Sequence, residues 1–594
     1  MKNKKQNRKI DFKGLQRVLN LMFKTYTWSC VFVVLGIIVY SISLIIVMTS
    51  IQNLIDNTII PMTNEFNQYG SVDYSPLIQQ FIFMATILIA GTFCSWFYSR
   101  IMVNVSNGTL LIIRKKLFEK MESLTLRYFD TTKHGDTMSV YTNDIDTLRQ
   151  LLSQGFPQFV DLGLSAITSF ICLMYLSVHL TILCLFMIAL MMIVLLKLGG
   201  SATKYFRDQQ KGLANINAFI EEMIKGQKVV KSFCHEEENK KSYDVLNNHL
   251  FNVSSKANVF SSIIMPICGN MGNVTYVLVS IVGGLLAINT TGIITIGSLI
   301  AFLTLTKSFT RIITQLSMQM TSIATSSAGA GRVWSLMDQV PEENNGKTKI
   351  DKEKSKGEVI FKNVNFGYNQ DKQILFDINI DAKPGKKIAI VGNTGAGKTT
   401  ITNLITRFYD IDSGSITLDG VPIKEIDKQN LRSNIGLVLQ DTHLYNTTVL
   451  ENIRYGRLDA TDEECIEAAK SVYADEFISH MPNKYDTELK NDAANLSQGQ
   501  RQLIAIARAA ISDPLILILD EATSSIDTKT ERAVQKGMDK LMQGRTSFVI
   551  AHRLSTIKNA DCIMVMQEGK IIESGSHEQL LENKGRYYHL YTGK

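Results

Sequence analysis

The sequence has few cysteines, and none of them has the spacing that metal sites or redox motifs require. The 8 cysteines include no Cys-x-x-Cys pair, and most lie within apolar runs. Cysteines in such surroundings behave as small buried hydrophobic residues. This pattern excludes a disulfide-stapled secreted domain and predicts no cysteine-bound metal.

A strong excess of one charge is also missing. The chain carries 62 Lys and Arg against 55 Asp and Glu, a formal net charge of +7. The basic residues cluster beside apolar runs, where the preference of membrane proteins for positive charge on the inner face explains them. This distribution argues against nucleic acid as a partner.

The sequence has no secretory cleavage site after its first apolar run. That run, 28–51, is also longer than the core of a signal peptide. Before it, the basic stretch 1–10 and apolar residues at helical spacing in 11–26 predict an amphipathic helix on the cytoplasmic face of a membrane. Further runs long enough to span a bilayer lie at 77–98, 157–178, 181–198, 262–288 and 297–323.

The loops between these runs differ in charge, which predicts the orientation. Residues 52–76 contain no Lys or Arg, whereas five basic residues lie between 114 and 127. The positive-inside preference therefore places the N-terminus and the two long connections in the cytoplasm, with 178–180 and 289–295 as short outer turns. We expect segments 101–156 and 199–260 to continue the membrane helices into the cytoplasm. Each would have a turn near its far end that could touch a soluble domain.

Four polar residues within the last two spans are candidates for a substrate cavity. These are Asn270, Asn273, Lys307 and Arg311. Charges in a span usually face a bundle interior or an aqueous cavity, because lipid solvates them poorly. The two basic side chains could instead reach toward inner headgroups, and the sequence leaves both interpretations open.

The composition changes after the last span. Residues 326–356 read as a linker, and 357–594 alternate short strands and helices like a soluble α/β domain. The predicted organisation is an amphipathic segment 1–26, a six-helix membrane domain 27–325, the linker 326–356 and the soluble domain 357–594. The N- and C-termini are both expected in the cytoplasm of a multi-pass cell-membrane protein.

A phosphate-binding loop is the strongest motif of the soluble domain. It follows the apolar run 388–391 and opens a helical pattern, as a strand–loop–helix junction requires. Its backbone N–H groups would converge on phosphate oxygens. Lys398 would reach the β- and γ-phosphates, and the Thr399 hydroxyl would bind Mg²⁺. The loop consists of Gly392, Asn393, Thr394, Gly395, Ala396, Gly397, Lys398, Thr399 and Thr400.

Other polar residues stand where predicted strands and helices end or begin. The apolar run 515–519 leads into Asp520 and Glu521, which would hold Mg²⁺ through water and activate the attacking water, respectively. Ser497 and the Gly499 N–H would form a second anion site at a helix N-terminus. The strand-end residues Gln440 and His552 could reach a γ-phosphate. Tyr368 could stack on a purine, although aromatic residues on strands are usually core.

Together with Leu496 to Gln500 and the loop 524–527, these motifs stand in an order that resembles ATP-binding cassette (ABC) proteins. With six spans ahead of them, the chain is similar to a half-transporter of the type IV exporter class, a membrane α-helical domain followed by an α/β P-loop NTPase domain. The resemblance implies binding of ATP and Mg²⁺, with Tyr368 on adenine and Gln440 in the Mg²⁺ shell beside Thr399 and Asp520. It also implies a signature that clamps ATP bound to a partner chain, a loop containing Asp527, and His552 stabilising the transition state. The signature residues are Ser497, Gln498, Gly499 and Gln500.

One segment departs from the pattern of many homodimeric exporters. After Thr487 and Glu488, the residues 489–494 resemble the glutamate-bearing half of heterodimeric bacterial multidrug exporters. The resemblance therefore favours a non-identical second half-transporter, with a homodimer as the alternative.

The expected function is ATP-driven export of small hydrophobic or amphipathic compounds by alternating access. A lipid or lipopeptide flippase is one alternative. An ATP-gated channel or regulator with little turnover is another, but the presence of both Glu521 and His552 favours turnover.

Overall fold

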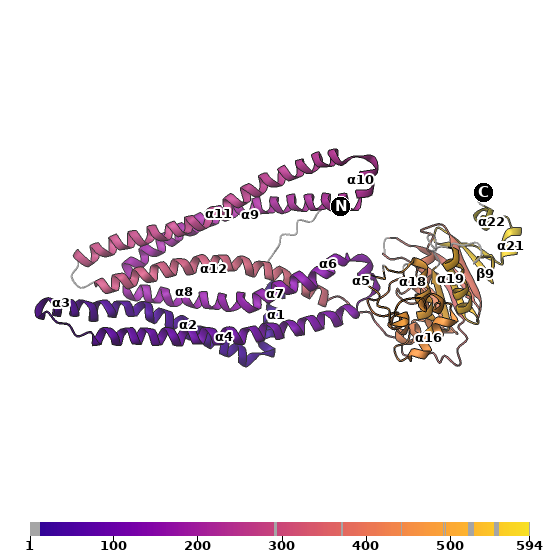
Figure 1. Ribbon diagram of the computed structural model, residues 1–594, viewed down its shortest axis with the longest axis horizontal. Helices are drawn as coiled ribbons and strands as arrows, with labels where there is room; N and C mark the ends of the chain where they lie inside the picture. The colour runs from indigo at the N-terminus through magenta and orange to yellow at the C-terminus, as the bar shows by residue number, and fades with distance from the viewer. Residues whose placement is uncertain are drawn as a thin grey trace. The chain divides into compact units, whose positions relative to one another are not determined.

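The computed structural model describes residues 12–289, 294–369, 372–440, 442–490, 492–493, 495–520, 528–551 and 557–592. The chain divides into two units (Figure 1). The first unit comprises Met1–Glu122 and Lys133–Gln339, and the second comprises Ser123–Thr132 and Val340–Lys594.

The first unit is helical, and six of its helical segments are long and apolar enough to cross a membrane. This confirms the six predicted spans. The helices α9 and α11 lie side by side as a long hairpin closed by α10 (Figure 1). The elements are α1 Phe12–Thr25, α2 Thr27–Asn53, η1 Leu54–Ile59, α3 Ile60–Tyr69, α4 Ser75–Glu122, α6 His134–Ser139, η2 Val140–Asp144, α7 Ile145–Gln150, η3 Leu151–Gly155, α8 Phe156–Leu176, α9 Val178–Lys225, α10 Gln227–Phe233, α11 Glu236–Asn289 and α12 Ile296–Met337.

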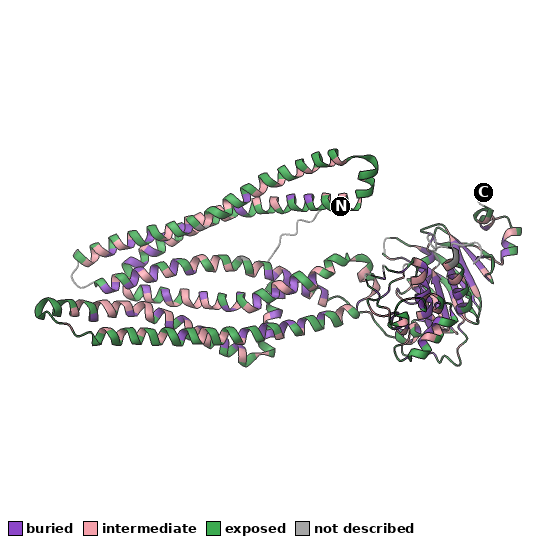
Figure 2. Cartoon of the chain, in the orientation of Figure 1, coloured by how far each residue is buried: buried purple, intermediate pink, exposed green. Residues whose placement is uncertain are grey.

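Much of the surface of the long helices is exposed (Figure 2), and many of the exposed side chains of α2, α4, α8, α9 and α11 are apolar. Phe93 and Ile89 of α4, for example, are 63% and 70% exposed. An aqueous surface would make such a face costly, but the hydrocarbon of a bilayer solvates it well. The exposure pattern therefore agrees with the apolar runs of the sequence.

Two boundaries differ from the sequence prediction. The turn between α8 and α9 lies at Ser177, whose hydroxyl accepts a hydrogen bond from the Leu180 N–H, so residues 178–180 begin a helix. The helix α12 continues to Met337, well past residue 325 and into the predicted linker. Small side chains misled the prediction here, because Ser327 and Ala330 are fully buried in the helical unit instead of exposed in a linker.

The N-terminal helix α1 packs on protein along its apolar side. Leu15, Val18 and Met22 are buried, and α1 contacts α12 and α4. Arg17 donates two hydrogen bonds to Asp338, at 2.6 and 2.9 Å, and lies 4.0 Å from the ring centroid of Trp334. The predicted amphipathic helix is therefore confirmed, and part of its apolar side packs on α12, while Phe12 stays 60% exposed. Its position on the membrane surface stays a prediction.

The second unit contains two sheets. The smaller is antiparallel with order β2-β1-β4-β5, and the larger has order β10-β9-β3-β8-β7-β6 with parallel pairing from β9 to β6. The strands are β1 Val359–Phe366, β2 Leu375–Ala382, β3 Lys387–Gly392, β4 Ser413–Leu418, β5 Val421–Pro422, β6 Ile435–Val438, β7 Ile516–Asp520, β8 Thr546–Ile550, β9 Cys562–Gln567 and β10 Lys570–Gly575.

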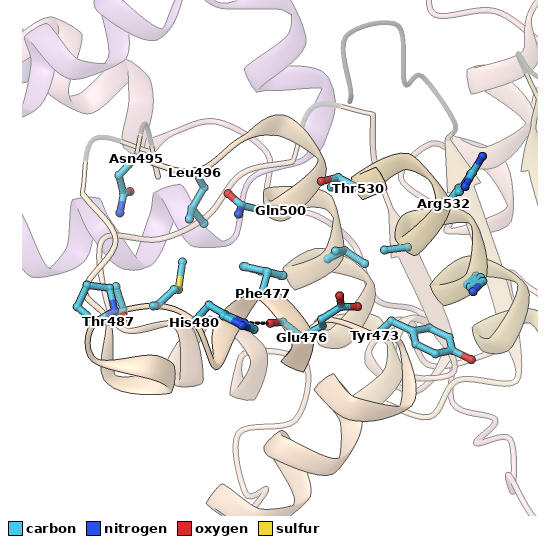
Figure 3. Close-up of a pocket in the computed structure, with 15 residues that line it drawn as sticks. Tyr473, Glu476, Phe477, His480, Thr487, Asn495, Leu496, Gln500, Thr530 and Arg532 are labelled. Carbon is cyan, nitrogen blue, oxygen red and sulfur yellow. Dashed lines mark hydrogen bonds between the residues drawn. The ribbon is translucent and has the colours of Figure 1, made fainter. Parts of the chain in front are cut away.

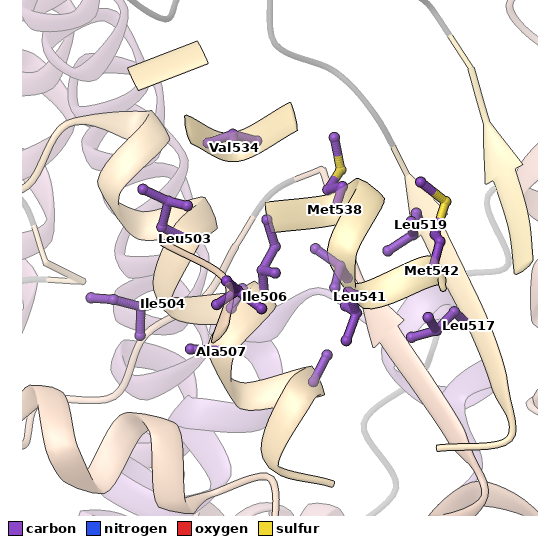
Figure 4. Close-up of a cluster of buried hydrophobic side chains, with 14 of the residues drawn as sticks. Leu503, Ile504, Ile506, Ala507, Leu517, Leu519, Val534, Met538, Leu541 and Met542 are labelled. Carbon is purple, nitrogen blue, oxygen red and sulfur yellow. The ribbon is translucent and has the colours of Figure 1, made fainter. Parts of the chain in front are cut away.

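The helices of this unit cover the sheet and create its main core. Leu503 and Ile506 of α18 pack with Val534 and Met538 of α19 and with Leu517 of β7 (Figure 4). The helices are α5 Leu126–Thr131, α13 Lys398–Ile405, α14 Lys428–Ser433, α15 Val449–Arg454, α16 Asp462–Ser471, α17 Asp475–Ile478, η4 Lys484–Asp486, α18 Gln498–Ile511, α19 Thr528–Met542, α21 His577–Glu582 and α22 Arg586–Thr592.

A short segment from the early part of the chain, Ser123–Thr132, belongs to the second unit. The Ser123 carbonyl accepts a hydrogen bond of 2.6 Å from the Glu342 N–H, and Leu126 packs against the core of the smaller sheet. One of the two predicted turns thus makes contact with the soluble part of the chain.

Candidate nucleotide-binding site

The predicted phosphate loop lies at the carboxyl end of β3, a central strand of the larger sheet. Residues 393–395 are exposed, so their backbone is open to a ligand. Gly397, which caps α13, has φ +99°, and a Cβ there would lie 2.7 Å from the Leu375 side chain. Both the backbone angle and the close approach therefore require glycine.

Lys398 begins α13 and is buried, with 7% of its surface exposed. Its Nζ donates hydrogen bonds to the carbonyls of Gly392, at 2.7 Å, and Asn393, at 3.1 Å. Burial lowers the pKa of Lys398, and the Asp520 carboxylate partly opposes this effect. The ammonium is thus held inside the loop curve, where phosphate oxygens could replace the two carbonyls.

The strand ends bring further candidates to the same edge of the sheet. Asp520 ends β7, and Gln440 follows β6, the neighbouring parallel strand. Because the carboxyl ends of parallel strands share an edge, both side chains lie on the phosphate-loop side. Gln440 is exposed and also lines a hollow of about 370 Å³ with Gln498 and Arg501 of α18.

The described residues fit a nucleotide with Mg²⁺. Thr399 is exposed beside the phosphate loop, and Asp520 lies within electrostatic reach of Lys398. No group of three or more His, Cys, Asp or Glu in the described part of the chain could hold a metal ion alone. Thr399, Asp520 and Gln440 would therefore hold Mg²⁺ together with nucleotide phosphates, as is usual for this ion.

The Tyr368 ring is packed against other side chains of the domain. Its ring lies edge-on to Phe366 and Tyr409, at centroid distances of 5.0 and 4.9 Å. Its hydroxyl lies 3.2 Å from the Thr400 hydroxyl and accepts a hydrogen bond of 3.3 Å from Asn403 on α13. The half-buried ring therefore has a structural role, and stacking on adenine stays a prediction.

The predicted signature forms the N-terminus of α18. The Ser497 hydroxyl accepts from the Gln500 N–H at 3.3 Å, and the Gln500 side chain accepts from the Ser497 N–H at 3.0 Å. This reciprocal capping box uses both polar side chains, whereas Ser497 remains exposed and Gly499 is buried. Only part of the predicted anion site therefore faces solvent in the isolated chain.

A second hollow lies beside the signature but apart from the phosphate loop. It has a volume of about 940 Å³ and is lined by Phe477 of α17, Leu496, Gln500 and Arg532 of α19, among others (Figure 3). None of the phosphate-loop residues lines it. Its volume alone therefore does not make it the nucleotide site.

Three predicted site residues lie outside the described residues. They are Glu521, Asp527 and His552. In sequence, Glu521 directly follows the last residue of β7, and His552 comes two residues after β8. Their roles stay predictions.

The four membrane-unit candidates are not brought together by hydrogen bonds among the described residues. Asn270 and Asn273 on α11 and Lys307 and Arg311 on α12 all have exposed side chains. Sequence reasoning missed Asp161 on α8, which accepts a hydrogen bond from Ser41 on α2. A carboxylate within a predicted apolar span was the signal that could have found it.

Sequence reasoning also missed two contacts of the second unit. The Tyr409 hydroxyl donates a hydrogen bond to Asp130, and His443 Nδ1 lies 2.9 Å from the Asp492 carboxylate. The first joins residues far apart in the chain, so no local pattern indicates it. The second involves Asp492 of the unusual segment 489–494, which therefore contacts the loop after Gln440.

Comparison with known proteins agrees with this arrangement. The family models described as "ABC transporter transmembrane region" and "ABC transporter" match residues 29–313 and 375–524. The uncharacterized ABC transporter ATP-binding protein YfiC of Bacillus subtilis is 38% identical over 88% of this chain and 86% of its own length.

Two further relatives carry substrate names. A fatty acid ABC transporter ATP-binding/permease protein of Mycobacterium tuberculosis is 37% identical over 90% of this chain and 84% of its own length. A putative multidrug export ATP-binding/permease protein, YgaD of Bacillus subtilis, is 34% identical over 84% and 85%, respectively. The chain therefore belongs to the ABC transporter family, as a multi-pass exporter half-transporter whose nucleotide-binding domain hydrolyses ATP to drive transport.

Proposed function

We propose that the chain exports small hydrophobic or amphipathic compounds, of the multidrug type, across the cytoplasmic membrane. The observation that carries the ATP-driven part is the buried Lys398 ammonium inside the phosphate loop, beside Asp520 and on the same sheet edge as Gln440. The positive charge of Lys398 and the oxygen ligands beside it suit a nucleoside triphosphate with Mg²⁺.

The site residues have separate proposed roles. Lys398 and the loop N–H groups bind phosphates, while Thr399, Asp520 and Gln440 hold Mg²⁺, which neutralises phosphate charge when bound. Glu521 accepts the proton of the attacking water, and His552 stabilises the charge that develops on the γ-phosphate.

Two half-transporters would together complete two nucleotide sites. Ser497 and Gly499 would contact the γ-phosphate of ATP bound to the partner, with Asp527 in the adjoining loop. We propose a non-identical partner, since Asp492 of the unusual segment 489–494 has its own contact to His443. The outer face of α10, with Val229 60% and Phe233 68% exposed, would then dock on the partner's soluble domain.

The proposed topology places both chain termini in the cytoplasm. The absence of Lys and Arg from residues 52–76 supports an outer position for that connection. Lipid export is the second candidate function, and the likeness to a fatty acid transporter supports it.

Transport in inverted membrane vesicles tests the proposal. Vesicles containing this chain and a co-expressed second half-transporter should take up a fluorescent amphipathic dye when ATP is added, and vesicles with Glu521→Gln should not. ATP-dependent movement of a labelled fatty acid without dye uptake would favour the lipid alternative. Dye uptake that is unaffected by Glu521→Gln would refute the proposed ATP-driven export.

The same vesicles test the partner. This chain alone should show little drug-stimulated ATPase, and co-expression of the second half should restore it. A stable, drug-stimulated homodimer would refute the heterodimer proposal and leave two equivalent sites.

A further inference from the structure

A carboxylate in the first unit lies among hydroxyl and aromatic groups at the depth of the membrane spans. Asp161 of α8 accepts a hydrogen bond of 2.7 Å from Ser41 of α2 and one of 3.5 Å from Ser165, both on Oδ1. Ser41 is fully buried, whereas Asp161 is half-buried. The site is therefore built by two contacting helices, and the carboxylate retains access from one side.

The second carboxylate oxygen of Asp161, Oδ2, is available for a further contact. Among the residues that the structure describes, Asp161 forms no ion pair, and its Oδ2 receives no hydrogen bond. An ionised carboxylate away from water needs a partner of opposite charge, because an unpaired charge there is costly. A ligand cation would supply that partner.

A contact between two helices gives a reference level for this group. Asp56 Oδ1 accepts a hydrogen bond of 2.8 Å from the Gly297 N–H, which sets these two residues at one level. Ser41 stands fifteen residues before Asp56 in the α2–η1 helix, and Arg311 stands fourteen residues after Gly297 in α12. At 1.5 Å per residue, both lie about 21–22 Å along their helices from this contact, a distance shorter than the roughly 30 Å thickness of a bilayer's hydrocarbon layer.

One aromatic ring lies near the carboxylate, and a second ring lies against the first. Tyr40, the neighbour of Ser41, interacts electrostatically with Asp161. Its ring centroid is 6.4 Å from that of Tyr98 on α4, with an interplanar angle of 58°. Aromatic faces attract organic cations, and they also provide the apolar surface that such cations carry around their charge.

We propose that Asp161, Tyr40 and Tyr98 form a binding site for lipophilic organic cations. The proposal rests on the proposed export of amphipathic compounds and specifies their charge. Asp161 contacts the positive centre through Oδ2, the Ser41 hydroxyl orients the carboxylate, and the two tyrosine rings contact the apolar groups of the ligand.

Arg311 is the positive side chain to be weighed against this assignment. Tyr40 interacts electrostatically with Arg311 as well as with Asp161. A guanidinium that served as the counterion of Asp161 would form a close, usually forked ion pair, and the described part of the chain contains none between these two residues. If Arg311 were the ligand-binding charge instead, the site would prefer an anion.

Two probes of the same shape and opposite charge separate these cases. Tetraphenylphosphonium and tetraphenylborate binding would be measured by equilibrium dialysis, without nucleotide, on the full-length protein with its partner in zwitterionic nanodiscs. The wild-type protein should prefer the phosphonium ion. Asp161→Asn should weaken phosphonium binding roughly ten-fold or more, as expected for a lost hydrogen-bonded charge, and should not weaken borate binding.

Matched variants keep the proposal falsifiable should Asp161→Asn fold poorly. Asp161→Glu should restore most of the phosphonium affinity, and Tyr98→Leu should weaken it about three-fold while Tyr98→Phe does not. Glu65→Gln, a change of the same charge on the exposed face of α3, should leave both affinities unchanged.

Three results would overturn the assignment. The first is equal affinity of the wild-type protein for the two ions. The second is loss of the binding of both ions in Asp161→Asn and also in Tyr98→Leu. The third is a wild-type preference for borate that disappears in Arg311→Ala. Because binding is measured without nucleotide, failure of the export function has a different signature. In that case phosphonium would still bind selectively, but ATP would drive no dye uptake into vesicles.

Discussion

The Tyr409 hydroxyl donates a hydrogen bond to the Asp130 carboxylate, joining the connection between α13 and β4 to a residue 279 positions earlier in the chain. The guanidinium of Arg127 lies 5.9 Å from the Tyr409 ring centroid, and the Tyr368 ring contacts the same tyrosine. Burial and the Asp130 carboxylate raise the pKa of Tyr409, so its hydroxyl stays a neutral donor well above neutral pH. The contact thus connects segment Ser123–Thr132 with a side chain that borders the phosphate-loop helix.

Tyr409→Phe should lower the thermal stability of the second unit, since a hydrogen bond to a charged group contributes about 1.5–3 kcal/mol. Combining Tyr409→Phe with Asp130→Asn should cost little more than Tyr409→Phe alone, because both changes remove one interaction. The measurement is the unfolding midpoint of each variant. Tyr455→Phe, which removes an exposed hydroxyl contact to Tyr445, should add independently to Asp130→Asn. Full additivity of the first pair would contradict the contact.

Glu521→Gln should slow ATP hydrolysis by roughly 10²–10⁴-fold, because the general base is lost while the phosphate contacts remain. Lys398→Ala should instead weaken ATP binding, since it removes charge-assisted hydrogen bonds. Nucleotide affinity and steady-state ATPase separate these outcomes. Turnover at the wild-type rate in Glu521→Gln would disprove its assignment as the general base.

Ser497→Ala should affect both stability and turnover. Removal of a helix-capping hydroxyl costs about 1 kcal/mol, and the same residue is proposed to contact ATP on the partner. Thr461 offers a matched control, because it forms the same capping box with Glu464 at the start of α16. Thr461→Ala should lower the unfolding midpoint similarly yet leave ATPase near the wild-type rate. Equal ATPase losses in the two variants would show that Ser497 acts only as a cap.

Nucleotide binding should take up protons at alkaline pH. Burial lowers the pKa of Lys398, whereas bound phosphates favour its charged form, so the pKa should rise on binding. ATP affinity should therefore fall as pH increases through the free-state pKa, toward the usual lysine value of about 10.4. Calorimetry in two buffers of different ionisation enthalpy reports the proton uptake, and Lys398→Arg should abolish it. Uptake that persists in Lys398→Arg would assign the proton to another group.

The same pKa predicts how this lysine affects folding. Its lowered folded-state pKa means that the unfolded chain binds more protons in the interval between the folded and unfolded values. At pH values below that interval, the contribution of Lys398 to folding stability is therefore unfavourable. The free energy of unfolding should increase as the pH rises across the interval. Lys398→Met should remove this increase from the unfolding midpoint measured against pH.

The spans and the phosphate loop could be predicted from the sequence, because each depends on residues that are close together in the chain. Run length alone predicted the six spans, and the spacing of Gly397 and Lys398 after an apolar strand predicted the phosphate loop. The end of α12 was missed because Ala330 and Gly331 resemble linker residues. In the structure they pack closely on Gly14 of α1, where an added Cβ would lie 3.0 Å from the Gly331 nitrogen. Contacts between distant segments, such as Asp130 with Tyr409, depend on the tertiary fold and leave no sequence period.

The membership of Ser123–Thr132 in the second unit has a consequence for biosynthesis. When this segment leaves the ribosome, its hydrogen-bond partner Tyr409 is still 279 residues from Asp130 along the unfinished chain. At translation rates of 5–20 residues per second, that interval lasts roughly 15–55 s. Leu126, which packs on the smaller sheet in the finished fold, lacks its binding surface throughout that time. The membrane helices are therefore made before the segment that follows α4 can reach its final partners, and assembly of the second unit ends only after translation of its C-terminal strands.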